Sequence, residues 1–262
     1  MEVIAQGHWR RVDFISDLHL HPGEPDTHTA WARYMQKTNT DALFILGDLF
    51  EVWVGDDLLD NPLGFESECV RIIRETAMRL PVYYMVGNRD FLMGMRFADE
   101  SHSIPLADPA TLDFFGNRIV LSHGDAWCLD DVAYQSFRTT VRSQEWQSAF
   151  LAKPLPERLD IARHIRSQSE AKKPLGSYAD VDIASAEAAL SAAKARTLIH
   201  GHTHLPATHG LPSGAERWVL SDWHIKPPHT PRLEVLRLQN QAAKGDFSLS
   251  RLHPELCDTG LN

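Results

Sequence analysis

The chain has few cysteines and no pattern that would join them. Cys69, Cys128 and Cys257 are widely spaced among 262 residues, odd in number and outside any C-x-x-C motif. Such a set is typical of a reduced compartment and excludes a disulfide framework or a thiolate metal site. The three thiols are therefore expected to be small buried side chains.

Long hydrophobic runs are also lacking. No run approaches the roughly 20 apolar residues that cross a bilayer, and residues 1–11 hold no apolar segment of the kind found in signal peptides. Neither membrane spanning nor export is expected. Low-complexity tracts and a Walker-type Gly-x-x-x-x-Gly-Lys motif are missing too, which indicates an ordinary globular chain without a phosphate-binding P-loop.

Positive charge is scarce overall. The 26 Lys and Arg residues are outnumbered by 35 Asp and Glu, for a net charge of −9, and this balance argues against nucleic acid as a partner. Residues 132–175 are the exception, because their eight basic side chains exceed their four acidic ones. A hydrophobic content of 43% is sufficient for one substantial core with an appendage.

What the chain does contain is five short polar clusters, each at the end of an apolar run. The runs are expected to be buried β-strands and cover residues 12–15, 42–46, 82–86, 119–121 and 197–199. The clusters that follow them are Asp17-Leu18-His19, Gly47-Asp48, Gly87-Asn88-Arg89-Asp90, His123-Gly124-Asp125 and Gly201-His202-Thr203-His204. Loops at the carboxyl ends of strands in an open α/β sheet converge on one crevice. The imidazoles, carboxylates and amide gathered there would suit two divalent ions acting on phosphate esters.

The spacing of the clusters indicates how the chain is organised. Successive intervals of 31, 40 and 35 residues separate the first four clusters, and each fits a strand, a crossover helix and the next strand. Residues 27–37 and 65–80 are expected to be the first two crossover helices. The interval from His123 to His202 is 79 residues, about twice as long, so it carries an insertion.

The inserted stretch, residues 132–175, has apolar residues at helical spacing, and Pro154 and Pro156 are expected to break the helices. In one interpretation it is an amphipathic helical subdomain that packs on the body. In the other it is a lid whose apolar groove, faced by Phe137 and Trp146, holds acyl chains while its basic residues meet phosphates or a membrane.

The end of the chain is expected to return to the core. A helix over residues 180–195 would lead into the strand at residue 197. Three further strand-like segments, residues 217–221, 232–238 and 247–252, would then complete a second sheet.

The ordered clusters resemble the calcineurin-like metallophosphoesterases, whose motifs are Asp-x-His, Gly-Asp, Gly-Asn-His-Asp/Glu, a strand-ending His-Gly and Gly-His-x-His. The resemblance extends from Phe14 to His204 and departs at Arg89, where most of the family has His. It implies an α/β fold, a four-layer α/β/β/α sandwich, with a core of residues 1–131 and 176–262 and a helical lid of residues 132–175. The segments that point to one branch of the family are Ser16-Asp17-Leu18-His19-Leu20, Gly47-Asp48-Leu49-Phe50-Glu51-Val52-Trp53 and His123-Gly124-Asp125 with Asp130-Asp131.

The resemblance also implies a dinuclear metal site whose ligands are the catalytic residues. One ion would be held by Asp17, His19, Asp48 and His204, and the other by Asp48, Asn88, His123 and His202. Asp48 would bridge, because a carboxylate has two oxygens for two cations and an imidazole cannot serve both. Two Mn²⁺ ions are expected, since the donor set has no thiolate.

Supporting roles are expected for three acidic neighbours. Asp90 and Asp125 would orient adjacent ligands. Glu51 either supports a ligand or caps the following turn.

The same branch implies substrate contacts at Asn88, Arg89, Asp131, Tyr134, Arg166, Ser169 and His202, with Lys172 and Lys173 as further phosphate contacts. Arg89 is a planar cation suited to phosphate, and its alternative role is an ion pair with Asp90 or Asp131. The implied substrate is a glycolipid nucleotide whose pyrophosphate is hydrolysed by water at the phosphorus next to the nucleoside. The implied setting is the cytoplasmic side of the inner membrane, with a monomer bound peripherally.

Two other functions stay open from the sequence. A different dinuclear phosphodiesterase or nucleotide phosphohydrolase would have the same core with another insertion. A non-catalytic metal-binding scaffold would be marked by missing ligands, and none of the motif positions is missing here.

Overall fold

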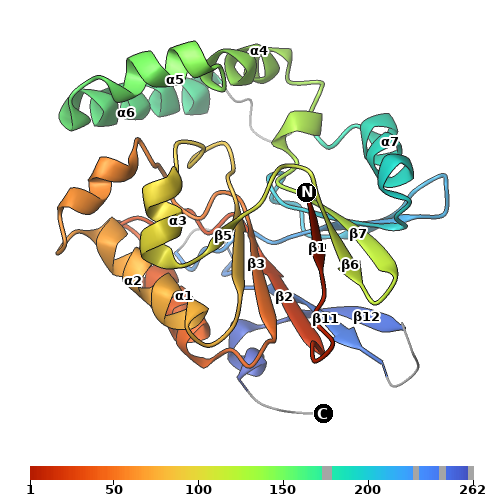
Figure 1. Ribbon diagram of the computed structural model, residues 1–262. Coiled ribbons are helices and arrows are strands. Elements are labelled where there is room, and N and C mark those ends of the chain that lie inside the picture. Colours follow the sequence, from red (N-terminus) through yellow and green to blue (C-terminus); the bar gives the residue numbers. More distant parts are fainter. Residues whose placement is uncertain (173–178, 227–229, 242–245, 259–262) are drawn as a thin grey trace.

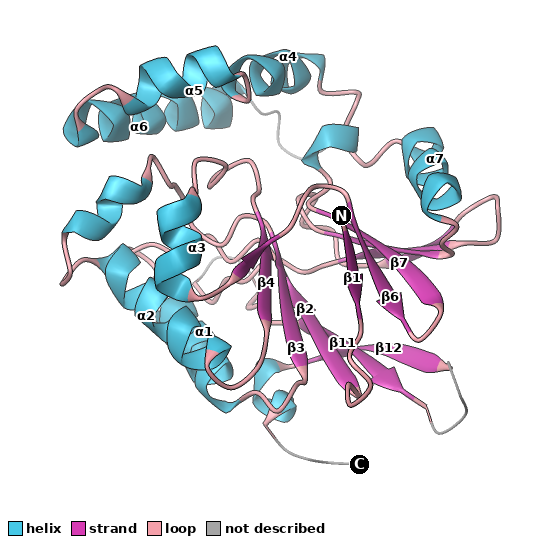
Figure 2. Ribbon diagram, viewed as in Figure 1, coloured by secondary structure: helices cyan, strands magenta, loops and turns pink. Residues whose placement is uncertain are grey.

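Two six-stranded sheets form the centre of the protein (Figures 1 and 2). The computed structural model describes residues 1–172, 179–226, 230–241 and 246–258. Within the first range, residues 168–172 are described by their backbone alone. The first sheet contains, in spatial order, β1 (Glu2–Ile4), β6 (Ala110–Phe114), β7 (Asn117–Ser122), β8 (Thr197–His200), β10 (Glu216–Val219) and β9 (Thr208–Gly210). The second contains β12 (Phe247–Leu252), β11 (Val235–Asn240), β2 (Arg11–Ile15), β3 (Ala42–Leu46), β4 (Val82–Met85) and β5 (Ile104–Pro105).

Apolar side chains from both sheets fill the space between them. Phe14 and Phe44 of the second sheet stack with their ring centroids 5.3 Å apart, and they belong to the same buried cluster as Leu112 and Ile119 of the first sheet. Strands buried on both faces appear in a sequence as continuous apolar runs. This burial explains why the runs before the polar clusters contain so few polar residues.

Helices cover the outer face of each sheet. Against the second sheet lie α1 (Pro25–Lys37), α2 (Phe65–Ala77) and α3 (Met95–Ser101), while α7 (Ile183–Ala193) packs against β7 and β8 of the first (Figure 2). On α2 the buried residues Cys69, Ile72 and Ile73 form one face at helical spacing. The four layers are therefore α/β/β/α, and the predicted fold class is confirmed.

The three strand-like segments after His204 do not complete one sheet, and this prediction was wrong. β10 pairs in parallel with β8 in the first sheet, whereas β11 pairs with β2 and β12 with β11 in the second. β11 also begins later than predicted, because Arg232 forms only an isolated bridge with His224. An alternating pattern identifies a buried face but not the neighbouring strand.

The third interval also differs from the prediction of a single crossover. After β4, α3 leads to the parallel strand β5, and the chain then passes to the other sheet through the antiparallel hairpin of β6 and β7. A length of 35 residues fits both arrangements, so spacing alone could not distinguish them.

Residues 132–172, the described part of the inserted stretch, form three helices that lie together across the end of the sheets where the polar clusters are (Figure 1). They are α4 (Val132–Val141), α5 (Gln144–Leu151) and α6 (Leu155–Lys172). Pro154 separates α5 from α6, but Pro156 lies inside the first turn of α6, where a helix does not need the missing N–H. Among the described residues, no helix combines the length and apolar character needed to cross a bilayer.

Candidate metal centre

The polar clusters meet at the carboxyl ends of strands from both sheets. Three of them follow β2, β3 and β4, and the other two follow β7 and β8. Hydrogen bonds join neighbouring clusters: the amide of Asp17 donates to the carbonyl of Gly47 at 3.1 Å, and that of Gly201 to the carbonyl of His123 at 3.0 Å. The clusters therefore converge, although on two facing sheets rather than on one.

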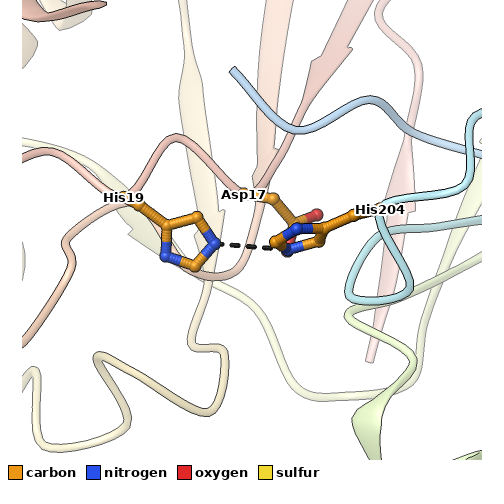
Figure 3. A group of neighbouring side chains, drawn as sticks. All are labelled: Asp17, His19 and His204. Atoms are coloured by element: carbon orange, nitrogen blue, oxygen red, sulfur yellow. Dashed lines mark hydrogen bonds and ion pairs between the residues drawn. The ribbon is translucent and has the colours of Figure 1, made fainter. Parts of the chain in front are cut away.

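A first donor group consists of Asp17, His19 and His204 (Figure 3). The two Nε2 atoms of the histidines lie 3.3 Å apart, and Nε2 of His204 lies 3.4 Å from Oδ1 of Asp17. Burial lowers the pKa of His19 to about 4, which leaves its ring neutral at pH 7. A neutral imidazole nitrogen aimed at a carboxylate and a second imidazole is a suitable donor for a divalent cation.

A second donor group is built around Asn88. Its Oδ1 lies 3.0 Å from Nε2 of His123 and 2.9 Å from Nδ1 of His202. The Nδ1 of His123 lies 3.0 Å from the carbonyl of Leu46, and because a carbonyl only accepts, Nδ1 donates and Nε2 faces the group. Such a backbone partner is what orients histidine ligands in metal sites.

Asp48 lies between the two groups. Its Oδ2 is 3.9 Å from Nε2 of His19, and its Oδ1 is 3.7 Å from Nε2 of His123. The backbone amide of Arg89 also donates to Oδ1 at 2.8 Å. Each carboxylate oxygen thus faces a different donor group, which is the arrangement that a bridging ligand requires.

Each donor group contains one histidine whose pKa is lowered and one whose pKa is raised. In the first group burial lowers the pKa of His204, but its hydrogen bond to Asp17 and nearby carboxylates outweigh burial and raise that pKa. In the second group burial lowers the pKa of His202 to about 3. Burial also lowers the pKa of His123, but the carboxylates of Asp48 and Asp17 outweigh it and raise that pKa to about 9. The negative charge collected here is thus balanced by a proton on His123, and a cation would replace that proton.

The backbone around the donors is left-handed at five positions. Positive φ angles occur at Asp17 (54°), His19 (47°), Asp48 (52°), His202 (68°) and His204 (54°). Residues other than glycine are uncommon in this region, and such outliers gather at functional sites. The sequence pattern contains no signal for this conformation.

Two glycines of the motifs are needed for close approach. A Cβ at Gly47 would collide with the ring of His123, and one at Gly87 would collide with the carboxylate of Asp48. Larger residues at these positions would push the donors apart.

Asp90 holds the loops of the site together. The buried carboxylate accepts hydrogen bonds from the amides of Gly87 at 2.7 Å and Leu49 at 2.8 Å. In the sequence, Gly87 precedes the donor Asn88 and Leu49 follows the donor Asp48. Burial and the charge of Asp48 raise the pKa of Asp90 to about 7. It therefore orients the donors through their backbone.

Asp125 has contacts other than those expected. Its Oδ2 accepts from the hydroxyl of Tyr134 at 2.5 Å and from Nε of Arg138 at 2.7 Å. Although burial raises the pKa of Asp125, the charges of His123 and Arg138 hold it well below its usual range. These contacts tie α4 to the loop after His123, so Asp125 positions the insertion.

Glu51 supports a donor, the first of its two expected roles. Its Oε2 lies 3.2 Å from Nδ1 of His19. Its Oε1 pairs with the guanidinium of Arg89 at 3.3 Å and with that of Arg166 from α6. Arg89 therefore pairs with Glu51. The expected alternative, an ion pair of Arg89 with Asp90 or Asp131, was wrong.

The inserted helices bring further predicted residues to the site. The ring of Tyr134 lies 5.9 Å from that of His202, and Asp131 caps α4 by accepting from the amide of Tyr134 at 2.9 Å. The side chains of Ser169 and Lys172, and Lys173 as a whole, lie outside the described residues.

Trp146 contacts one aromatic ring on its own helix and one on the body. Its ring stacks on Phe150 at 4.6 Å and lies 6.2 Å from Phe91 of the body. It therefore anchors α5, whereas Phe137 on α4 is 37% exposed.

The sequence analysis missed Asp222. Its Oδ2 lies 3.7 Å from Nδ1 of His204 and 3.1 Å from Nδ1 of His224, on the side of the His204 ring away from His19. Asp222 follows β10 and belongs to none of the motifs, so only the folded chain places it at the site.

The residues present fit two divalent cations. Nitrogen and oxygen donors form two groups, the carboxylates are buried, and Asp48 has one oxygen toward each group. Such a pair of cations would bind an anionic phosphoryl group between them.

Comparison with known proteins identifies a family and several named relatives. A family model described as "Calcineurin-like phosphoesterase" matches residues 10–206, which include all five clusters. A protein of Chromobacterium violaceum named UDP-2,3-diacylglucosamine hydrolase is 47% identical over 223 residues, covering 81% of this chain and 90% of that protein. A protein of Ralstonia nicotianae with the same name is 44% identical over 243 residues, covering 87% and 89%. Among solved structures, a "Novel Archaeal Phosphodiesterase" has 12% identity and a TM-score of 0.45, covering 92% of this chain and 99% of its own.

Proposed function

Because this chain belongs to the calcineurin-like phosphoesterase family, we propose that it is a hydrolase that cleaves the pyrophosphate of UDP-2,3-diacylglucosamine. The products are UMP and 2,3-diacylglucosamine 1-phosphate, and the reaction is a step of lipid A biosynthesis. The relatives that carry this name support the substrate. The observation that carries the chemistry is the position of Asp48, with one oxygen toward each donor group.

Two Mn²⁺ ions are the proposed cofactors. Asp17, His19, Asp48 and His204 would hold one, and the second would be held by Asp48 together with Asn88, His123 and His202. When bound, the ions supply positive charge for the phosphate oxygens and lower the pKa of water, which provides a nucleophile near neutral pH. Donors of nitrogen and oxygen without thiolate suit manganese.

The remaining residues bind and orient the substrate. The side chain of Arg89 is 26% exposed and follows Asn88 in the chain, so its guanidinium can reach a phosphate oxygen. Glu51 holds Arg89, Arg166 and His19 in one ion-pair network, so a substrate phosphate would meet cations that are already positioned. Tyr134 covers the ring of His202 from α4 and limits access of bulk water.

The insertion is proposed as the lipid-binding lid. Val132 is 73% exposed and Phe137 37% exposed on α4, within a stretch that has twice as many basic as acidic residues. Apolar surface next to cations suits acyl chains joined to an anionic head. The same surface would place a monomer peripherally on the cytoplasmic side of the inner membrane.

The position of bond cleavage gives a direct test. Purified protein is incubated with Mn²⁺ and detergent-dispersed UDP-2,3-diacylglucosamine in water enriched in ¹⁸O. We expect UMP to form and to carry the heavy oxygen, because water attacks the phosphorus next to uridine. Label in the sugar 1-phosphate instead would contradict attack at that phosphorus, and an absence of UMP in metal-loaded protein would contradict the function itself.

A further inference from the structure

A cavity of about 340 Å³ lies beside the candidate metal centre. Leu205, Pro206 and Ala207 line it directly after the candidate ligand His204. Arg232 lines it as well and donates from Nη1 to the carbonyl of His204 at 3.0 Å. The cavity and the metal centre therefore share a wall.

The charged groups at this cavity are already paired. Asp180 accepts two hydrogen bonds from the guanidinium of Arg217, at 2.6 and 2.8 Å. Arg232 pairs with Asp222 at 3.3 Å. The lining therefore combines neutralised polar groups with apolar surface from Leu205, Pro206 and Val219, which suits an uncharged ligand with flat faces and polar edges.

The inserted helices lie over a different part of the centre. Trp146 on α5 packs near Phe91, after β4, and Arg158 on α6 contacts the carbonyl of Val54 and the carboxylate of Asp57, after β3. The cavity instead lies against the loops after β8 and β10. In Figure 1, α5 and α6 lie above the α2 and α3 side of the molecule, and α7 marks the side of the first sheet.

A substrate with a lipid at one end and a nucleoside at the other must place its two phosphates between these regions. Ligand pockets typically measure roughly 300–1,000 Å³, so a volume of about 340 Å³ fits one nucleoside and is too small for two acyl chains. We propose that this cavity binds the uridine of the substrate, with its base against Leu205, Pro206 and Val219 and its phosphate outside the cavity, at the adjoining metal centre. This proposal rests on the proposed function.

Photochemical crosslinking of the wild-type protein tests the location. Metal-loaded protein is irradiated with 5-iodo-UMP and the adducts are mapped by tandem mass spectrometry. We expect adducts at residues 205–209, and competition by UMP should remove them. Adducts confined to α4 or α6 would place the nucleoside under the inserted helices and overturn the proposal.

A filled cavity gives a second test. Ala207→Phe should raise the inhibition constant of UMP about tenfold or more and leave that of 2,3-diacylglucosamine 1-phosphate unchanged. Ala30→Phe is the matched control, because Ala30 lines a cavity of about 310 Å³ between α1 and the segment around His253, and UMP inhibition should not change.

The outcomes separate the two proposals. Equal UMP inhibition in wild-type protein and in folded, metal-loaded Ala207→Phe would overturn the uridine site. The proposed function would survive that result as long as wild-type protein still releases UMP from UDP-2,3-diacylglucosamine. If wild-type, metal-loaded protein releases no UMP from UDP-2,3-diacylglucosamine, the proposed function is refuted, whatever the crosslinks show about UMP binding.

Discussion

Asp48 is the residue on which the two-cation scheme depends most. Asp48→Ala removes both carboxylate oxygens, one from each donor group. We expect the loss of at least one metal ion and a fall in activity larger than the roughly 10–100-fold that loss of an outer partner costs. Inductively coupled plasma mass spectrometry measures the metal, and circular dichroism checks the fold. Asp258→Ala, outside the centre, should change neither, and an active Asp48→Ala protein with two ions would refute the scheme.

Arg89 contributes to the site in two separable ways. Its backbone amide holds Asp48 at 2.8 Å, and its side chain pairs with Glu51. Arg89→Ala keeps the amide, so metal content should stay constant while KM rises or kcat falls.

Arg163→Ala is the control for this change, because Arg163 is 75% exposed and paired with Asp160 on α6, and exposed pairs contribute little. A loss of metal in Arg89→Ala would show instead that the side chain orients the donors.

At the scale of elements, α4 is where the lipid-binding role of the insertion can be isolated. Phe137→Asp places a charge on its 37% exposed apolar surface. Burial of a methylene contributes about 0.8 kcal/mol, so turnover of the diacylated substrate should fall strongly. Hydrolysis of a small chromogenic phosphodiester should persist, because its reacting group needs only the metal centre.

Phe115→Asp is the matched control for α4. Phe115 is also 37% exposed but lies in the turn between β6 and β7, at the opposite end of β7 from His123. It should leave both activities unchanged. An equal fall of both activities in a stable, metal-loaded Phe137→Asp protein would make the insertion a structural element only.

The elements that the sequence predicts well are those whose signal is local. β2, β3 and β4 are buried on both faces, so their residues form continuous apolar runs, and the motif after each run marks its end. The local sequence does not indicate to which sheet β10 and β11 belong, because the packing of the whole chain decides which strands pair. The same holds within the site. The donors follow from the motifs, whereas the contacts of Glu51 and the approach of Asp222 to His204 come from distant segments.

For the whole molecule, metal binding and folding are coupled. Carboxylates of Asp17 and Asp48 are buried together, and their repulsion is relieved by bound cations. A ligand at 100 times its dissociation constant stabilises a protein by about 2.7 kcal/mol, and each kcal/mol shifts Tm by roughly 2–4 °C at this size.

Metal removal should therefore lower the Tm of the wild-type protein by about 5–10 °C in differential scanning calorimetry. The Tm of Asp48→Ala should respond much less to a chelator. An unchanged Tm in wild-type protein stripped of metal would show that the site adds nothing to the stability of the fold.

The left-handed backbone at five donor positions also bears on how the donor loops depend on the cations. Each non-glycine residue in this conformation costs about 1–2 kcal/mol, a strain that glycine would relieve. Replacing a donor with glycine would relieve this strain but would also remove a metal ligand, and with it part of the stabilisation that bound cations contribute. The strain of the donor backbone is therefore offset only when the cations are bound, which couples the conformation of these loops to the metal.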